Sequence, residues 1–202
     1  MERNLHKEKR TIKRKRMKTI AMIIAMLALT PAMAQTKISG NVMPNVMKVG
    51  SEYLKMNGGG IREKLVFDLY VGVLYLQEKS SDADEIINGD RPMAIKIKII
   101  SGMVDNDNFK EALEEGFEKS TNDNVAPYRE RMDDMMAEGF KEDIKTNDVY
   151  DIVYQPGTGC TLSKNGTALI TVPGLDFKKA LFGVWLCDDP ADAGLKKKML
   201  GN

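Results

Sequence analysis

Two stretches of the chain alternate between apolar and polar positions. In residues 61–76 every second position is apolar apart from Glu63, and residues 93–99 place apolar residues on one parity and Lys96 and Lys98 on the other. A period of two is typical of a strand with one buried face. We therefore predict a strand at 92–100 and another at 61–76, the latter as one long strand or two joined at a bulge.

Shorter segments with strand character lie on either side of these two. They are residues 51–56, 148–154, 160–162 and 168–172, with an irregular or strand-like lead-in at 36–49. The glycines at 58–60 predict a bend that leads into residue 61. Asn165-Gly166 predicts a tight hairpin turn between the last two strands.

The middle and the end of the chain change to helical spacing. An apolar stripe of period 3.6 is formed by Phe109, Ala112, Leu113, Gly116 and Phe117. Asn108 and Glu111 are expected to cap this helix, a second helix is predicted at 127–140, and two more close the chain. Strands and helices come in blocks, without regular β-α-β alternation. This order predicts an α+β fold in which a layer of helices covers one face of a large antiparallel sheet.

The first 34 residues have the pattern of a secretory signal peptide. A basic head precedes an apolar run at 20–29, and Ala32-Met33-Ala34 fits the A-x-A cleavage rule. That run is about half the roughly 20 residues that a membrane-spanning helix needs. We expect cleavage after Ala34, with Met17 as an alternative start, and one exported domain at residues 35–202, periplasmic or secreted. An uncleaved membrane anchor is the alternative.

Removing this segment changes the charge of the protein. The whole chain has 30 Lys and Arg and 29 Asp and Glu, of which residues 1–34 hold nine and two. Residues 35–202 therefore carry 21 basic and 27 acidic side chains, a formal charge of −6. Such a domain lacks the basic surface that nucleic acids require and has no polybasic segment for anionic lipids.

The only histidine, His6, lies in the segment that we expect to be removed. Without histidine, residues 35–202 cannot form a Ser-His or Cys-His nucleophile, and they lack the commonest metal ligand. Asp105-Asn106-Asp107 begins like a calcium loop, but Lys110 stands where that loop needs glycine. We expect neither a metal nor a cofactor.

Two cysteines are present, Cys160 and Cys187. An exported protein can form a disulfide from such a pair. Their separation in space decides between a disulfide and two free thiols, so both alternatives stay open.

Several blocks of residues 45–202 carry a family resemblance when they are taken in order. They are Gly58-Gly59-Gly60-Ile61-Arg62, residues 70–76, residues 154–159 with Asn165-Gly166, residues 177–190, and Leu195-Lys196 with Leu200-Gly201. The ordered set resembles the chalcone isomerase-like family. The resemblance implies an open-faced β-sandwich, in which a helical layer lies on one side of a large antiparallel sheet with a cleft between them.

In this family, plant enzymes that cyclise chalcones hold a phenolate with an arginine. They also use a threonine on the following strand, and a tyrosine and an asparagine seven residues apart on a helix. By position Arg62 matches the arginine, Tyr70 lies at or near the threonine, and Phe109 and Gly116 occupy the helical pair. A further specificity position falls on Lys178. A phenyl ring and a hydrogen cannot donate hydrogen bonds, and loss of one such donor costs about 2.7–4 kcal/mol. The resemblance thus implies no catalytic residues here.

Fatty-acid-binding members of the family keep the arginine and a nearby tyrosine as a carboxylate clamp. A guanidinium suits this role because its planar fork matches the two oxygens of a carboxylate. Arg62 and Tyr70 share one parity and are expected to face one cleft, whereas Tyr75 points the other way unless a bulge intervenes. We expect a small apolar anionic ligand, such as a fatty acid. Its candidate contacts are Arg62, Tyr70, Tyr75, Phe109, Gly116 and Lys178.

Two other functions stay open at this point. One is an enzyme, either an isomerase of chalcone-like or other phenolic substrates or an unrelated lyase. The other is an interaction module with a filled cleft, in which Arg62 is structural and pairs with an internal acid such as Asp68. The sequence does not indicate the oligomeric state.

Overall fold

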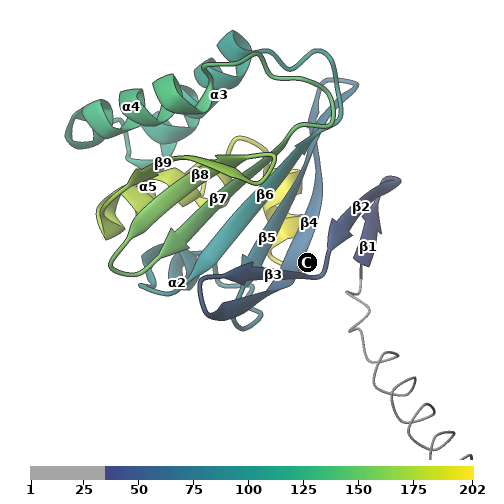
Figure 1. Cartoon of the computed structure of the whole chain (residues 1–202), viewed down its shortest axis with the longest axis horizontal. Coiled ribbons are helices and arrows are strands. Elements are labelled where there is room, and N and C mark those ends of the chain that lie inside the picture. Colours follow the sequence, from purple (N-terminus) through teal and green to yellow (C-terminus); the bar gives the residue numbers. More distant parts are fainter. Residues whose placement is uncertain (1–34) are drawn as a thin grey trace, which may run out of the picture. The chain divides into compact units, whose positions relative to one another are not determined.

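The computed structural model describes residues 35–202, and the predicted signal peptide at 1–34 lies outside the described residues. Its main element is a curled, seven-stranded antiparallel sheet in which each strand pairs with the next one in sequence (Figure 1). The strands are β3 (Val46–Val49), β4 (Glu52–Lys64), β5 (Phe67–Leu76), β6 (Met93–Ile99), β7 (Val149–Gln155), β8 (Gly159–Lys164) and β9 (Thr167–Val172). A separate hairpin consists of β1 (Gln35–Ile38) and β2 (Asn41–Pro44).

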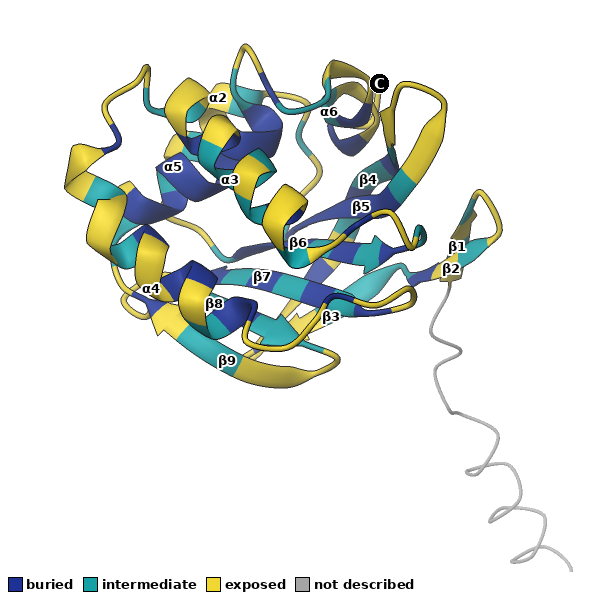
Figure 2. Ribbon diagram, turned by 90° about the horizontal axis from the view of Figure 1, so that it is seen from above, coloured by how far each residue is buried: buried dark blue, intermediate teal, exposed yellow. Residues whose placement is uncertain are grey.

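Helices gather on one face of this sheet (Figure 2). They are α2 (Ala83–Asn88), α3 (Asn106–Ser120), the 3-10 turn η1 (Ala126–Tyr128), α4 (Arg129–Gly139), α5 (Leu175–Leu186) and α6 (Ala193–Met199). Helix α3 packs on α5, α4 lies against β8 and β9, and α6 lies against β4 and β5. The predicted α+β fold, with one helical layer on an antiparallel sheet, is confirmed. Helix α2 was not predicted.

Alternate residues of β5 enter two separate hydrophobic clusters, because successive side chains of a strand point to opposite faces. Tyr70 and Leu74 belong to the larger cluster, between the sheet and the helices. Val71 and Tyr75 belong to a smaller one on the other face, which also includes Met43 of β2. The β1–β2 hairpin thus contributes to covering the second face of the sheet.

The structure corrects the prediction for residues 61–76. These residues form the end of β4 and the whole of β5, with a tight hairpin turn at Leu65 and Val66. Leu65 takes the left-handed backbone conformation, with φ of 60°, that such turns require. Sequence patterns identify such a turn by Gly, Asn or Asp, so the aliphatic residues Leu65 and Val66 do not predict it.

The predicted glycine bend is also wrong, since Gly58, Gly59 and Gly60 lie inside β4. They are needed for close packing rather than for a turn. A Cβ at Gly58 would collide with the backbone oxygen of Lys198, and one at Gly60 would collide with the Lys198 side chain. The register shift between Met56 and Gly58 marks the irregularity at this point of the strand.

The cap of α3 differs from the expected Asn108 and Glu111 pair. The N-cap of α3 is Asp105, whose carboxylate accepts from the Asn108 backbone N–H at 2.9 Å in a reciprocal capping box. Cys160 and Cys187 are both free thiols. Among residues 35–202, no helix is long and apolar enough to cross a membrane.

Candidate functional site

Arg62 and Tyr70 are direct cross-strand partners near the turn that closes the β4–β5 hairpin. The guanidinium carbon of Arg62 lies 5.7 Å from the centre of the Tyr70 ring, a cation–π distance. The sequence pattern predicts one cleft for both residues because they share a parity in a single strand. The structure brings them together by pairing across the hairpin instead.

The two side chains line a pocket of about 240 Å³ between the hairpin and the start of α3. The other lining residues are Lys64, Leu65, Phe67, Leu69, Met103, Val104, Asn108, Phe109 and Ala112. Most of these are apolar. Arg62 and Lys64 are the charged ones, so the pocket combines a hydrophobic wall with positive charge and no carboxylate.

The hydroxyl of Tyr70 is held in place from the opposite side. Tyr70 is only 1% exposed, and its oxygen accepts a hydrogen bond of 2.9 Å from the indole Nε1 of Trp185 on α5. Since an indole N–H can only donate, the phenolic O–H of Tyr70 keeps its own proton for another acceptor. The bond fixes the position of the hydroxyl of Tyr70, the residue whose ring lies beside Arg62.

Arg62 makes no ion pair with any carboxylate of residues 35–202. The alternative in which Asp68 neutralises it therefore finds no support. A half-buried guanidinium at the wall of a pocket favours an anion as its partner. The pocket beside Arg62 also argues against the interaction module with a filled cleft.

Phe109 forms the inner wall of the pocket. Its ring meets Tyr70 edge-on at 6.1 Å between centroids and packs on Phe140 at 5.4 Å. On its far side lies a second cavity of about 20 Å³, which has no charged residue in its lining. That lining comprises Ile97, Phe109, Leu113, Phe117, Met132, Met135, Met136, Phe140, Tyr150, Ile152, Leu162 and Leu181. Phe109 thus separates the polar-mouthed pocket from an apolar interior rich in methionine.

A comparison of the sequence with protein families agrees with this fold and this pocket. The sequence profile described as chalcone isomerase-like matches residues 35–201. The chain belongs to the chalcone isomerase-like family. No curated protein matches it in sequence. In structure it is similar to the fatty-acid binding protein AtFAP1 of Arabidopsis thaliana, with a TM-score of 0.66 and 16% identity over 83% of this chain and 96% of that chain. At this level of identity the likeness establishes a shared fold.

Three further candidate residues, Tyr75, Gly116 and Lys178, lie outside the lining of the Arg62 pocket. Tyr75 lies in the cluster on the other face of the sheet, where its hydroxyl donates to the Pro44 carbonyl at 2.7 Å. Gly116 faces α5, and a Cβ there would lie 2.5 Å from Cγ1 of Val184. This glycine serves the close packing of α3 on α5.

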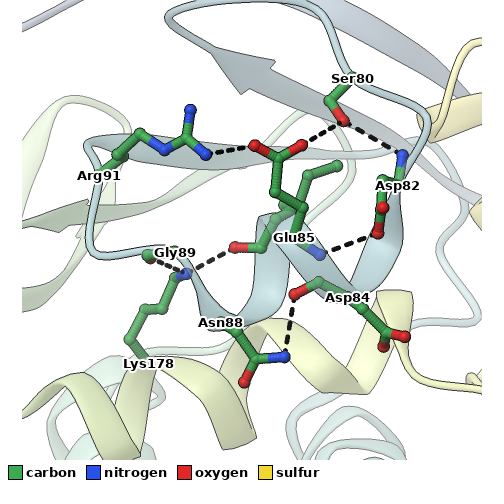
Figure 3. A network of polar contacts seen from close by, with 9 residues as sticks. Ser80, Asp82, Asp84, Glu85, Asn88, Gly89, Arg91 and Lys178 are labelled. Atoms are coloured by element: carbon green, nitrogen blue, oxygen red, sulfur yellow. Dashed lines mark hydrogen bonds and ion pairs between the residues drawn. The ribbon is translucent and has the colours of Figure 1, made fainter.

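Lys178 is the third of these residues, and its ammonium group is used inside the fold. The side chain is fully buried, and Nζ donates to the carbonyl oxygens of Ile86, Ile87 and Gly89 at 2.7–2.8 Å. These oxygens lie at the C-terminal end of α2, where cations satisfy free carbonyls (Figure 3). Burial lowers the pKa of Lys178 to about 8.

A larger cavity of about 460 Å³ lies between α2, the start of β6 and the adjoining ends of β4 and β5. Several of its polar groups bind one another. Arg91 pairs with Glu85, as Figure 3 shows, and the Gln77 amide donates to Glu52 at 3.3 Å. The Arg62 pocket, whose arginine has no such partner among residues 35–202, is therefore the better candidate site.

The sequence predicts neither the hydrogen bond from Trp185 to Tyr70 nor the place of Asn108 in the pocket lining. Nothing local links Trp185 to Tyr70, because the two residues are 115 positions apart. The sequence predicts Asn108 as part of the helix cap, and it does belong to the capping box while also lining the pocket. Residues 35–202 contain no cluster of three metal-binding side chains.

Proposed function

We propose that the Arg62 pocket binds the carboxylate of a small apolar acid, such as a fatty acid, without catalysis. Arg62 supplies a bidentate donor, and Tyr70 supplies a hydroxyl proton whose direction is set by Trp185. The single observation that carries the proposal is an arginine that has no carboxylate partner among residues 35–202, in a pocket with apolar walls. The likeness in fold to a protein named for fatty-acid binding supports it.

The apolar tail would extend past Phe109. The Arg62 pocket, at about 240 Å³, is smaller than the roughly 300–1,000 Å³ of typical ligand pockets. A short acid fits within it, whereas a long chain needs the cavity behind Phe109 as well. Three methionines line that cavity, and their flexible side chains can repack around a guest. We expect affinity for short acids in the present arrangement and adjustment of Phe109 for longer ones.

Isomerase activity is the second candidate because of the family's name, and the helical positions disfavour it. Phe109 offers no hydrogen-bond donor, and Gly116 lies against Val184 where a larger side chain would collide. Restoring the missing donor at residue 116 would thus need α5 to move. A chalcone cyclisation rate well above the uncatalysed reaction would favour the enzyme.

The clamp is tested by equilibrium titration of decanoate and by extraction of lipid that co-purifies with the protein. Arg62→Ala should weaken decanoate binding by about 10- to 100-fold, because hydrogen bonds to charged groups contribute about 1.5–3 kcal/mol. Arg62→Lys should lie between Arg62→Ala and the wild type, since it keeps the charge and loses the fork. Arg91→Ala is the matched control and should bind as the wild type does. Unchanged binding in Arg62→Ala would refute the clamp.

We also propose that the protein is exported, periplasmic or secreted, after loss of residues 1–34. The order of basic head, apolar run and Ala32-Met33-Ala34 supports this. N-terminal sequencing of the protein from its native host tests it. A chain that begins at Gln35 is the expected result, and a retained apolar segment would favour the membrane anchor.

A further inference from the structure

Exposed apolar side chains concentrate at the mouth of the Arg62 pocket. Leu65 is 91% exposed and Val66 is 85% exposed, at the turn that joins β4 to β5. Phe67 and Met103 are also among the exposed large hydrophobic residues, and both line the pocket together with Leu65. Figure 2 shows this end of the β4–β5 hairpin as exposed. Single exposed apolar residues are ordinary, whereas a contiguous group marks an interaction site.

The turn itself goes against the usual choice of residues. A two-residue hairpin turn favours Gly, Asn or Asp, which tolerate a positive φ and prefer water. Here Leu65 adopts φ of 60° and presents its side chain to solvent. Neither folding nor solubility requires a leucine and a valine at this position. A partner with an apolar surface would explain both.

Charge on the rim indicates the kind of partner. The charged residues that line the pocket are Arg62 and Lys64, both basic, and no carboxylate lines it. The neighbouring cross-strand pair, Glu63 and Asp68, does not contribute to the pocket wall. Glu63 and Asp68 balance the charge of the hairpin end as a whole, so attraction to an anionic surface is confined to the side that carries Arg62 and Lys64. The rest of residues 35–202, whose formal charge is −6 in total, is repelled by such a surface. A negatively charged lipid layer matches both the basic rim and the apolar tip.

We propose that the tip of the β4–β5 hairpin, residues 65–67, inserts with Met103 into the surface of an anionic lipid bilayer. The apolar side chains enter the acyl boundary, and Arg62 and Lys64 lie at the depth of the headgroups. The inference rests on the proposed function, because it places the pocket mouth where an apolar acid is dissolved. The ligand then exchanges between the bilayer and the pocket without crossing bulk water.

The test uses residues 35–202, which contain both hydrophobic clusters and match the family profile almost entirely. Vesicles of phosphatidylcholine mixed with phosphatidylglycerol are sedimented with the protein. Val66→Asp should weaken binding by about tenfold or more, because it removes a membrane-buried apolar side chain and adds a repelled charge. Val42→Asp is the matched control: Val42 is 44% exposed on β2, lies outside the pocket lining and receives the same change in charge.

Two further variants sharpen the result. Val66→Trp should bind the mixed vesicles more tightly, because tryptophan favours the membrane interface. Lys64→Gln should weaken binding to the mixed vesicles more than to phosphatidylcholine alone. Equal sedimentation of wild type and Val66→Asp, or equal loss in Val42→Asp, would overturn the proposal. So would a change in molar mass by light scattering for Val66→Asp without a change in vesicle binding, since that marks contact between copies of the chain.

Decanoate titration without vesicles separates this inference from the proposed function. Val66 does not line the pocket, so Val66→Asp should bind decanoate as the wild type does. If neither protein binds decanoate, the proposed function fails. If both bind it equally and vesicle binding is also equal, only the membrane inference fails.

Discussion

Trp185 donates its indole N–H to the hydroxyl oxygen of Tyr70 across 2.9 Å. The bond links the last long helix of the domain, α5, to the strand that carries one side of the candidate site. Tyr70 is therefore both a structural residue and a candidate ligand contact. The two roles can be separated by experiment.

Tyr70→Phe should lower the free energy of unfolding by about 1–3 kcal/mol, because it leaves the buried Trp185 N–H without an acceptor. Urea denaturation measures this. Trp185→Phe and the double variant complete a thermodynamic cycle, in which the double variant should lose less than the sum of the two single losses. Simple additivity would contradict a direct bond. Decanoate binding should also weaken in Tyr70→Phe.

Gly58→Ala should destabilise the domain by about 3 kcal/mol, at the upper end of the cost of overpacking. The new methyl group would meet the Lys198 carbonyl oxygen of α6, and backbone atoms cannot rotate away. Gly102→Ala is the control, since a Cβ there has only the Thr146 hydroxyl nearby, at 3.8 Å. The free energy of unfolding of both variants is the measurement. Equal values for the two would contradict close packing of α6 on β4.

Lys178→Met should destabilise the protein by about 3 kcal/mol, because three carbonyl oxygens at the end of α2 lose their donor. Lys179→Met is the matched control, and both variants should bind decanoate normally. A large loss of decanoate binding in Lys178→Met, with little loss of stability, would instead indicate that Lys178 contacts the ligand.

The same lysine predicts a dependence of stability on pH. Burial lowers the pKa of Lys178 to about 8 in the folded protein, against 10.5 for an unperturbed lysine. Between these values the unfolded chain binds more protons than the folded one, so stability should rise with pH. The difference in unfolding free energy between wild type and Lys178→Met should therefore grow from pH 8 toward 10.5. A difference that stays flat would contradict the lowered pKa.

Asp148 predicts a loss of stability in acid. Burial alone would raise the pKa of this carboxyl, but hydrogen bonds from Asn165, the Lys145 backbone and Lys164 together lower it below 3.8. The folded state thus favours the carboxylate. The stability that it contributes is present above pH 3.8 and is lost as pH falls through the lowered value. Asp148→Asn should lose stability at neutral pH and approach the wild type in acid, while the exposed Asp143→Asn follows the wild type throughout.

Much of the fold follows from local patterns in the sequence. The alternation in residues 92–100 corresponds to β6, because a strand with one buried face has apolar residues at every second position. The stripe around Phe109 corresponds to α3, because a helix with one buried side has apolar residues at a period of 3.6. The hairpin turn at Leu65 leaves no such local signal. Because its residues are aliphatic, the alternation continues across the reversal as if the strand were unbroken.

The resemblance to the family predicts a residue of the candidate site correctly only where the residue at the family position also lines the pocket. Arg62, Tyr70 and Phe109 line one pocket, although Arg62 and Tyr70 meet by pairing across the hairpin and not by parity within one strand, and their role in binding stays a prediction. Gly116 and Lys178 occupy family positions, but one is needed for helix packing and the other caps α2. No local pattern indicates such uses, because each depends on a partner far along the chain.

The packing of α6 on β4 has a consequence for the order in which the domain can be completed. The Asn57 amide donates to the Met199 carbonyl at 2.8 Å, and these residues are 142 positions apart. During synthesis the glycines of β4 leave the ribosome long before the helix that covers them. The strand β4 is therefore synthesised early, but its packing is completed only when α6 is present. The domain reaches its final packing only after nearly all of residues 35–202 have been released.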